Sequence, residues 1–94
     1  MDKIKRHAEL VNKLHEVYKQ KNTAYGDSFG KSFADWGMAA ACVRITDKFN
    51  RMITLARHPE VDSGDERITD TLMDMANYCL MTVMEIEQDR ERGS

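Results

Sequence analysis

The sequence predicts an all-α fold, and three observations support that prediction. Apolar residues recur in steps of three and four along most of the chain, which is the spacing of an amphipathic helix. No segment shows the period-two alternation that is typical of a strand. The single proline and the few glycines fall between the periodic segments. We therefore expect three main helices joined by two short connections and one loop rich in aromatic residues and glycine.

The first expected helix runs from about Ile4 to Asn22. Its apolar stripe contains Ile4, Ala8, Val11, Leu14 and Tyr18. The stretch that follows, from Tyr25 to Gly37, concentrates aromatic rings and glycines and has no long periodic pattern. We expect an ordered loop there, with room for one short turn of helix.

The second expected helix runs from about Met38 to His58, and Pro59 ends it. Ser63 and Glu66 have the spacing of a capping box, which predicts the start of a third helix that continues to about Asp89. This role accounts for Glu66 without a ligand, although its carboxylate remains a weaker candidate. Between Leu72 and Met84 the third helix is almost wholly apolar, so we expect it to be buried on most sides.

The length and composition of the chain indicate one domain spanning residues 1–94. It has 94 residues, of which 41% are hydrophobic and 32% are charged, as in a globular protein. A chain of this size buries only about 60–65% of its unfolded surface on folding. Three helices also leave one side of a bundle open. We therefore expect oligomerisation, as a homodimer or a larger homo-oligomer, to complete the helical bundle.

The net charge, the two cysteines and the lack of a long apolar segment indicate which partners and which cell compartment to expect. A net charge of −2 argues against a nucleic acid polymer as the partner and favours a small molecule. Cys42 and Cys79 have no metal-binding spacing, so we expect buried thiols in a reducing cytoplasm. The charged N-terminus is unlike a signal peptide, and no run of 18 apolar residues occurs. These features predict a cytoplasmic protein with no membrane partner.

The second expected helix carries a charged stripe beside its core face. Arg44, Asp47, Lys48 and Arg51 follow one another at helical spacing, so that three cations and one carboxylate share one side. Arginine offers a bidentate fork and lysine a point charge, and both suit a phosphate-bearing ligand. The alternative is a solvated face with internal ion pairs.

The third expected helix places a carboxylate in its apolar stretch. Asp74 lies there, with Asp70 one turn before it and Asn77 nearly one turn after it on the same face. A buried carboxylate is costly unless it is paired or bound to a metal, and two neighbouring carboxylates favour a cation between them. Mg²⁺ with substrate phosphates would satisfy both aspartates. The structural alternative is that Asp74 pairs with Lys48 or Arg44 and fixes the helix register.

These residues occur in three motifs that follow one another in order, and together they resemble a known family. The motifs are Lys21-Asn22-x-x-Tyr25-Gly26-Asp27-Ser28-Phe29, Arg44-Ile45-x-Asp47-Lys48-x-x-Arg51 and Asp70-Thr71-Leu72-x-Asp74-x-Ala76-Asn77-Tyr78. They resemble the short, largely phage-encoded nucleotide-modification-associated domain. That domain is distantly similar to the MazG-like all-α nucleoside triphosphate pyrophosphohydrolases. The resemblance covers residues from about Lys21 to Glu87.

The resemblance implies a helical bundle of two or more subunits, in which carboxylates hold magnesium and the metal holds a nucleotide's phosphates. Water would attack between the α- and β-phosphates and release a nucleoside monophosphate and pyrophosphate. Carried over by position, Asp74 and Asp70 would be catalytic and, together with Asp47, would bind the metal. Lys48, Arg44 and Arg51 would contact phosphate, and Asn77, Tyr25 and Phe29 would face the sugar or base.

Two functional hypotheses follow from these patterns. The first is a magnesium-dependent (deoxy)nucleoside triphosphate pyrophosphohydrolase. The second is a non-catalytic phage protein that sequesters a host signalling nucleotide, linear or cyclic. The second hypothesis draws on a departure from the enzymes, whose first motif is a Glu-Glu-x-x-Glu cluster, whereas here Asp47 is followed by Lys48 and Arg51. A helical scaffold whose charged stripes are interfaces is a third option.

Overall fold

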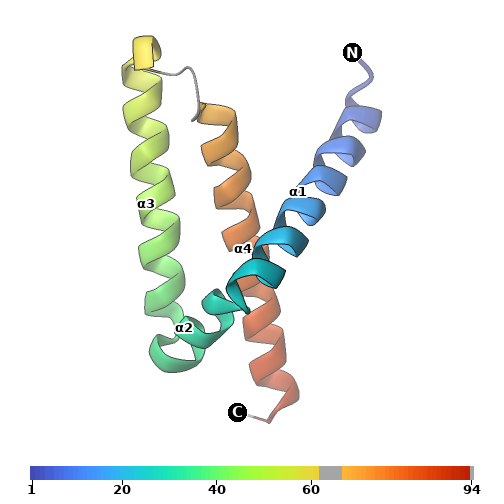
Figure 1. Cartoon of the computed structure of the whole chain (residues 1–94), viewed down its shortest axis with the longest axis vertical. Coiled ribbons are helices and arrows are strands. Elements are labelled where there is room, and N and C mark those ends of the chain that lie inside the picture. The colour runs from blue at the N-terminus through green and yellow to red at the C-terminus, as the bar shows by residue number, and fades with distance from the viewer. Residues whose placement is uncertain (62–66, 94) are drawn as a thin grey trace.

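The computed structural model describes residues 1–61 and 67–93, and within these residues the chain is all-α (Figure 1). Its elements are α1 (Lys3–Tyr25), α2 (Ser28–Trp36), α3 (Met38–Arg57), the short 3₁₀-helix η1 (Pro59–Val61) and α4 (Ile68–Glu91). Both ends of α1 and α3 and the C-terminal end of α4 agree with the expected helices to within three residues, whereas α4 begins at Ile68, later than expected. The predicted capping box of Ser63 and Glu66 lies outside the described residues.

The expected aromatic loop is instead the helix α2, which has nine residues. Its sequence contains one pair of residues at helical spacing. Phe29 and Phe33 are one turn apart, and both are buried. A Cβ atom at position 30 would collide with the Asp27 carboxylate, so a larger residue than Gly30 would force that side chain to move. Gly26 lies in the turn before α2 and Gly37 follows its end, so two glycines of this stretch bound the helix.

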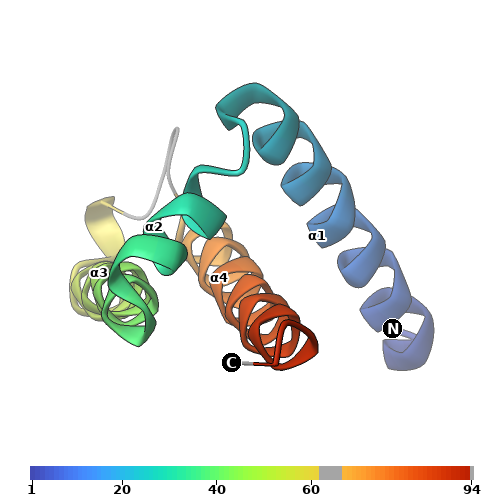
Figure 2. The same ribbon diagram turned by 90° about the horizontal axis from the view of Figure 1, so that it is seen from below.

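The turn between α1 and α2 is built from two residues in the left-handed conformation. Gly26 caps α1 with a φ of 60°, and its backbone N–H donates to the carbonyl oxygen of Asn22. Asp27 follows with a φ of 56°, which short polar residues adopt more readily than bulky ones. The chain turns sharply at these two residues, and α2 starts directly after the turn (Figure 2).

The core lies where α2 packs onto the pair formed by α3 and α4. The α3–α4 contact is the most extensive in the molecule, and the two helices lie side by side in Figure 1. Phe29, Phe33 and Ala41 form the buried cluster, and Tyr78 and Met81 of α4 pack against it. A small core of this kind leaves much of each helix at the surface.

Several apolar side chains of α4 are exposed in the single chain, so the prediction of a helix buried on most sides is wrong for the single subunit. Leu72, Leu80 and Val83 are 42%, 52% and 52% exposed. The expected buried thiols are also wrong, because Cys42 and Cys79 are exposed. Helices α1, α2 and α3 all contact α4, and these apolar side chains nevertheless stay exposed.

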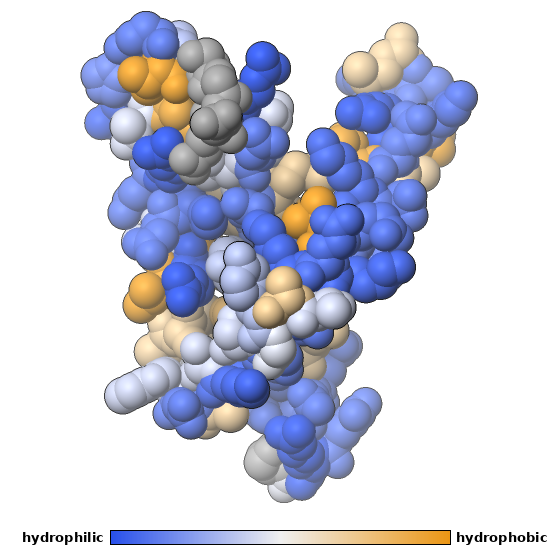
Figure 3. Space-filling model, viewed as in Figure 1, coloured by the Kyte–Doolittle hydropathy of each residue, from blue (hydrophilic) through white to orange (hydrophobic). Residues whose placement is uncertain are grey.

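Helix α1 diverges from the rest of the chain toward its N-terminus (Figures 1 and 2). The space-filling view shows two arms with a notch between them, and apolar atoms at the base of the notch (Figure 3). The radius of gyration is 15.0 Å, whereas a compact chain of this length has about 12 Å. None of the described helices is long and apolar enough to cross a membrane.

Candidate functional site

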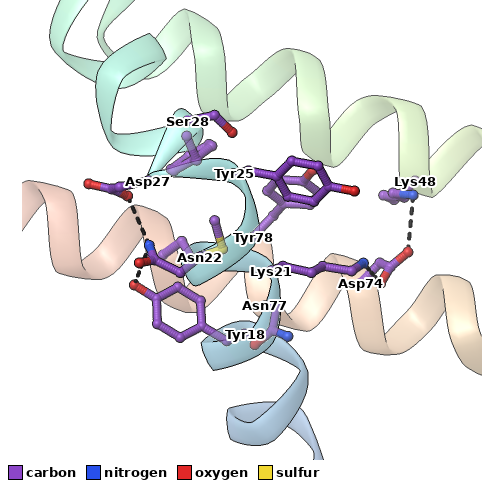
Figure 4. Close-up of a pocket in the computed structure, with 12 residues that line it drawn as sticks. Tyr18, Lys21, Asn22, Tyr25, Asp27, Ser28, Lys48, Asp74, Asn77 and Tyr78 are labelled. Atoms are coloured by element: carbon purple, nitrogen blue, oxygen red, sulfur yellow. Dashed lines mark hydrogen bonds and ion pairs between the residues drawn. The ribbon is translucent and has the colours of Figure 1, made fainter.

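A pocket of about 200 Å³ lies where the C-terminal half of α1, the start of α2, and the middles of α3 and α4 meet (Figure 4). We call it the α1–α4 pocket. It is lined by Tyr18, Lys21, Asn22, Tyr25, Asp27, Ser28, Phe29, Lys48, Asp74, Asn77, Tyr78 and Met81. Helical spacing explains the α1 contribution, because Tyr18, Lys21, Asn22 and Tyr25 share one face of that helix.

Asp74 lies between two lysines at one end of this pocket. Its Oδ2 atom is 3.1 Å from Nζ of Lys48, and its Oδ1 atom is 3.4 Å from Nζ of Lys21. The side chains of Asp74 and Lys48 are each 28% exposed, so this pair is partly shielded from water. The structural alternative for Asp74, an ion pair with Lys48, is thereby confirmed. The carboxylate holds two ammonium groups at the pocket wall.

A polar network occupies the opposite end of the pocket. The Asn22 side-chain amide donates to the Tyr18 hydroxyl and to the Asp27 carboxylate, each at 3.3 Å. The Asn77 amide donates to the carbonyl oxygen of Leu14 at 3.1 Å, which links α4 to α1. These bonds place amide, hydroxyl and carboxylate groups at the wall of one concave site.

Aromatic side chains form the apolar part of the pocket. Tyr25 is 67% exposed at the end of α1, and its side chain lines the pocket (Figure 4). Phe29 also lines the pocket but is buried, with its ring centroid 5.6 Å from that of Tyr78 and 6.2 Å from that of Phe33. Tyr25 therefore offers a ring face to a ligand, whereas Phe29 serves mainly the core.

A second concave site adjoins the pocket along α3. We call it the basic hollow, and it is lined by Arg44, Asp47, Lys48, Arg51 and Tyr78. Lys48 and Tyr78 line both sites. The predicted phosphate residues are thus brought together, with Arg44 and Arg51 in the basic hollow and Lys48 at its boundary with the α1–α4 pocket.

The predicted metal ligands are not gathered in the same way. Asp74 lines the pocket, Asp47 lines the basic hollow, and Asp70 accepts a hydrogen bond at 3.2 Å from the backbone N–H of Arg67 at the start of α4. Among the described residues, no three His, Cys, Asp or Glu side chains come together in a way that could hold a metal ion. Both Asp74 oxygens already face ammonium groups. Within the part of the chain that the structure describes, Asp74, Asp70 and Asp47 are not brought together around one point, and magnesium stays a prediction.

Comparison with known proteins assigns most of the chain to one family. The sequence model of a family described as nucleotide modification associated domain 1 matches residues 21–86. The chain belongs to this family. No curated protein and no solved structure matches the chain.

Membership of the nucleotide modification associated domain 1 family confirms the resemblance seen in the three motifs and indicates a nucleotide-related role. The matched range contains all the predicted site residues and every residue of the α1–α4 pocket except Tyr18. The site described above therefore lies almost entirely within the part of the chain that matches the family.

Sequence reasoning assigned no site role to seven residues of the pocket: Tyr18, Lys21, Asn22, Asp27, Ser28, Tyr78 and Met81. Tyr18 was counted only as part of an apolar stripe. Lys21, Asn22 and Asp27 stood in the first motif, but their meeting with α4 depends on how α1 crosses that helix. The i, i+3, i+4 and i+7 spacing of Tyr18, Lys21, Asn22 and Tyr25 was the signal that could have identified the three α1 residues among them.

Proposed function

We propose that this chain binds a nucleotide, with the nucleoside in the α1–α4 pocket and the phosphates in the basic hollow. The observation that carries the proposal is that Lys48 and Tyr78 line both sites, so one ligand can occupy the two together. Nucleotides have this same division into a planar, hydrogen-bonding part and an anionic part. The family description supports the choice of ligand class.

The phosphate end follows from the charges on α3. Three cations and one carboxylate line the basic hollow, although the whole chain has a net charge of −2. Arg44 can offer two parallel N–H donors to a phosphate, and Lys48 adds an ammonium group. Asp74 holds that ammonium group in place at 3.1 Å before the ligand arrives. A prearranged cation loses less conformational entropy on binding than a mobile one.

The nucleoside end follows from the pocket wall. The exposed Tyr25 ring offers a face on which a base can stack. Asp27 provides acceptor oxygens for a sugar hydroxyl or a base amino group, and the Asn22 amide holds that carboxylate in place. Asn77 donates to Leu14, which orients its side-chain carbonyl oxygen as a further acceptor. These groups could distinguish bases by their hydrogen-bonding edges.

The function that we infer is binding without turnover, as in a protein that sequesters a nucleotide. Two ammonium groups on Asp74 suit the binding of an anion more than the holding of a metal. The pyrophosphohydrolase reaction would instead need Asp74 and further carboxylates to coordinate Mg²⁺ and orient water. The two functions can be separated by one variant and one panel of ligands.

The first experiment measures binding and turnover on the same samples. Ribo- and deoxynucleoside mono-, di- and triphosphates are titrated into the protein by calorimetry, once with Mg²⁺ and once with EDTA, and products are separated by anion-exchange chromatography. We expect at least one nucleotide to bind in both buffers and to remain intact. Monophosphate and pyrophosphate that appear only with Mg²⁺ would replace the binding function with the hydrolase. No binding by any nucleotide would favour the helical scaffold.

Charge variants test the placement of the phosphates. We expect Lys48→Ala and Arg44→Ala each to weaken nucleotide binding by at least about tenfold, because hydrogen bonds to charged groups contribute about 1.5–3 kcal/mol. Lys13→Ala is the matched control, since Lys13 is an exposed α1 cation that lines neither site. Equal affinity in all three variants would show that the phosphates bind elsewhere.

Asp74→Asn separates the two functions directly. In a binding protein the variant keeps affinity within a few fold, because the loss of lysine positioning is offset by the removal of a negative charge near the phosphates. In a metal-dependent hydrolase the same change abolishes turnover. Calorimetry and product analysis on this variant therefore give opposite results for the two hypotheses.

We further propose that a second copy of the chain covers the apolar face of α4. Leu72, Cys79 and Val83 share that face at helical spacing, Leu80 flanks it, and all four are exposed in the single chain. Light scattering on the eluting protein should give the mass of a dimer or a larger homo-oligomer. Leu80→Glu should lower that mass, whereas a monomeric mass for the unaltered protein would exclude the homo-oligomer.

A further inference from the structure

A third concave site lies between α2 and α3, and its wall contains the only tryptophan of the chain. We call it the Trp36 hollow. Trp36 is 73% exposed and Val43 is 59% exposed, and Ala39 and Ala40 add two small side chains to the wall. The buried cluster is formed by Phe29, Phe33 and Ala41, so the Trp36 ring is not needed to fill the core. A large ring left at the surface of a hollow is a ready stacking surface.

The Trp36 hollow shares one lining residue with each part of the proposed nucleotide site. Arg44 lines the Trp36 hollow and also the basic hollow. Phe29 lines the Trp36 hollow and also the α1–α4 pocket. Along α3, one stripe of residues thus passes from an apolar wall at Ala40 to a cationic one at Lys48. The cations lie between two surfaces that can each accept a planar ring.

We propose that the Trp36 hollow is a second nucleobase subsite, and that the ligand class is a dinucleotide, two nucleosides joined through phosphate. This inference rests on the proposed function and extends it. One base occupies the α1–α4 pocket and the other stacks on Trp36. The phosphates that join them lie against Lys48 and Arg44, which is the order in which the three sites adjoin one another.

The α1–α4 pocket and the Trp36 hollow differ in the groups that they offer to a base. Tyr25 and Tyr78 are accompanied by amide and carboxylate groups, so the α1–α4 pocket can select a base by hydrogen bonding. The Trp36 hollow offers an aromatic ring, small aliphatic side chains and one guanidinium group. Stacking on such a wall tolerates any base, because every base has a π face. We therefore expect one selective and one tolerant base position.

The test compares ligands with and without a second nucleoside. Calorimetry is run on the full chain with AMP, ADP, the phosphodiester dinucleotide pApA and diadenosine tetraphosphate, with the matching guanosine set in parallel. We expect at least one dinucleotide to bind about tenfold more tightly than its mononucleotide, as one added stacking contact allows. The phosphodiester and polyphosphate ligands identify which linkage fits the cations.

The emission of Trp36 reports the second base directly, because no other tryptophan contributes on excitation at 295 nm. We expect saturating dinucleotide to quench this emission strongly and saturating mononucleotide to quench it weakly. Trp36→Ala should reduce the affinity for the dinucleotide to that for the mononucleotide and leave mononucleotide binding unchanged. Trp36→Phe keeps a stacking ring and should retain part of the difference.

The outcomes separate this inference from the proposed function. Mononucleotide binding with no gain from the second nucleoside, or with a gain that survives Trp36→Ala, would overturn the second subsite and keep the nucleotide function. Unchanged Trp36 emission at saturating dinucleotide would overturn it as well. Binding of no nucleotide at all would overturn both proposals.

Discussion

The two halves of α1 differ in how they relate to the rest of the chain. The C-terminal half contains Leu14, which is 8% exposed, and supplies Tyr18, Lys21, Asn22 and Tyr25 to the α1–α4 pocket. The N-terminal half projects away from α3 and α4 (Figure 1), and Ile4 and Val11 are 87% and 49% exposed. The apolar stripe that the sequence shows is continuous, but only its second part packs within the chain.

This difference shows that only a few contacts hold α1 against α4 beside the α1–α4 pocket. Leu14 is the one buried side chain that α1 contributes among the described residues. The Asn77 amide donates to the Leu14 carbonyl oxygen, and Lys21 pairs with Asp74. The residues of α1 that line the pocket depend on these contacts. Changes that release α1 should therefore affect ligand binding before they affect the α3–α4 pair.

The largest effect is expected for Leu14→Ala. Loss of a buried leucine costs about 2–5 kcal/mol, and this site lies in the lower part of that range because it borders the surface. We expect chemical denaturation to show a loss of about 2 kcal/mol in the free energy of unfolding, and calorimetry to show that nucleotide binding weakens. Both effects have one cause, the release of α1 from α4.

Val11→Ala is the matched control, since Val11 lies one turn earlier on the same stripe and is 49% exposed. Its effect should stay within about 0.5 kcal/mol, as for most surface substitutions. Equal destabilisation by the two substitutions would show that the N-terminal half of α1 is packed in the folded protein, for example against a second copy.

A smaller effect is expected for Asn77→Ala. The variant removes the hydrogen bond to Leu14, which contributes about 0.5–1.5 kcal/mol. Amide hydrogen exchange should become faster in the C-terminal half of α1, where protection depends on its contacts with α4. Exchange in the middle of α3 should stay unchanged. An equal increase in both helices would mean that Asn77 supports the global fold and not the position of α1.

The long helices could be predicted from the sequence because their apolar spacing extends over many turns. Met38 was predicted as the first residue of the second helix, and α3 begins there. Helix α2 was missed because it is short and contains Gly30, and its only periodic feature is the pair Phe29 and Phe33. The exposure of Cys79 was missed because a continuous apolar run does not show which of its faces has a partner.

The candidate site was predictable within one helix and not between helices. The stripe of Arg44, Lys48 and Arg51 follows from helical periodicity, and the structure gathers these residues in the basic hollow. The pairing of Asp74 with Lys48 was one of two alternatives that the sequence allowed. The meeting of Lys21 with Asp74 depends on the angle at which α1 crosses α4, and no local pattern encodes that angle.

The smallest effect is expected at Glu85, which lies near Asp27 at the turn that ends α1. Burial raises the pKa of Glu85 above its ordinary value of 4.5, the negative charges of Asp27 and Asp89 raise this pKa further, and Arg92 lowers it. The folded state therefore binds the Glu85 proton more tightly than the unfolded state does. The resulting stability is present below pH 4.5 and is lost as the pH rises through the folded-state pKa.

Glu85→Gln should remove the loss of stability that accompanies ionisation of Glu85, because glutamine keeps the shape of the side chain without its charge. Above the folded-state pKa we expect the variant to be more stable than the unaltered protein by up to about 0.5 kcal/mol, in the range of surface changes. The difference should disappear when denaturation is repeated at a pH below 4.5. A gain of the same size at every pH would instead indicate better packing at position 85. Because Asp27 lines the α1–α4 pocket, the same variant also shows by calorimetry whether the charge of Glu85 weakens nucleotide binding at that end.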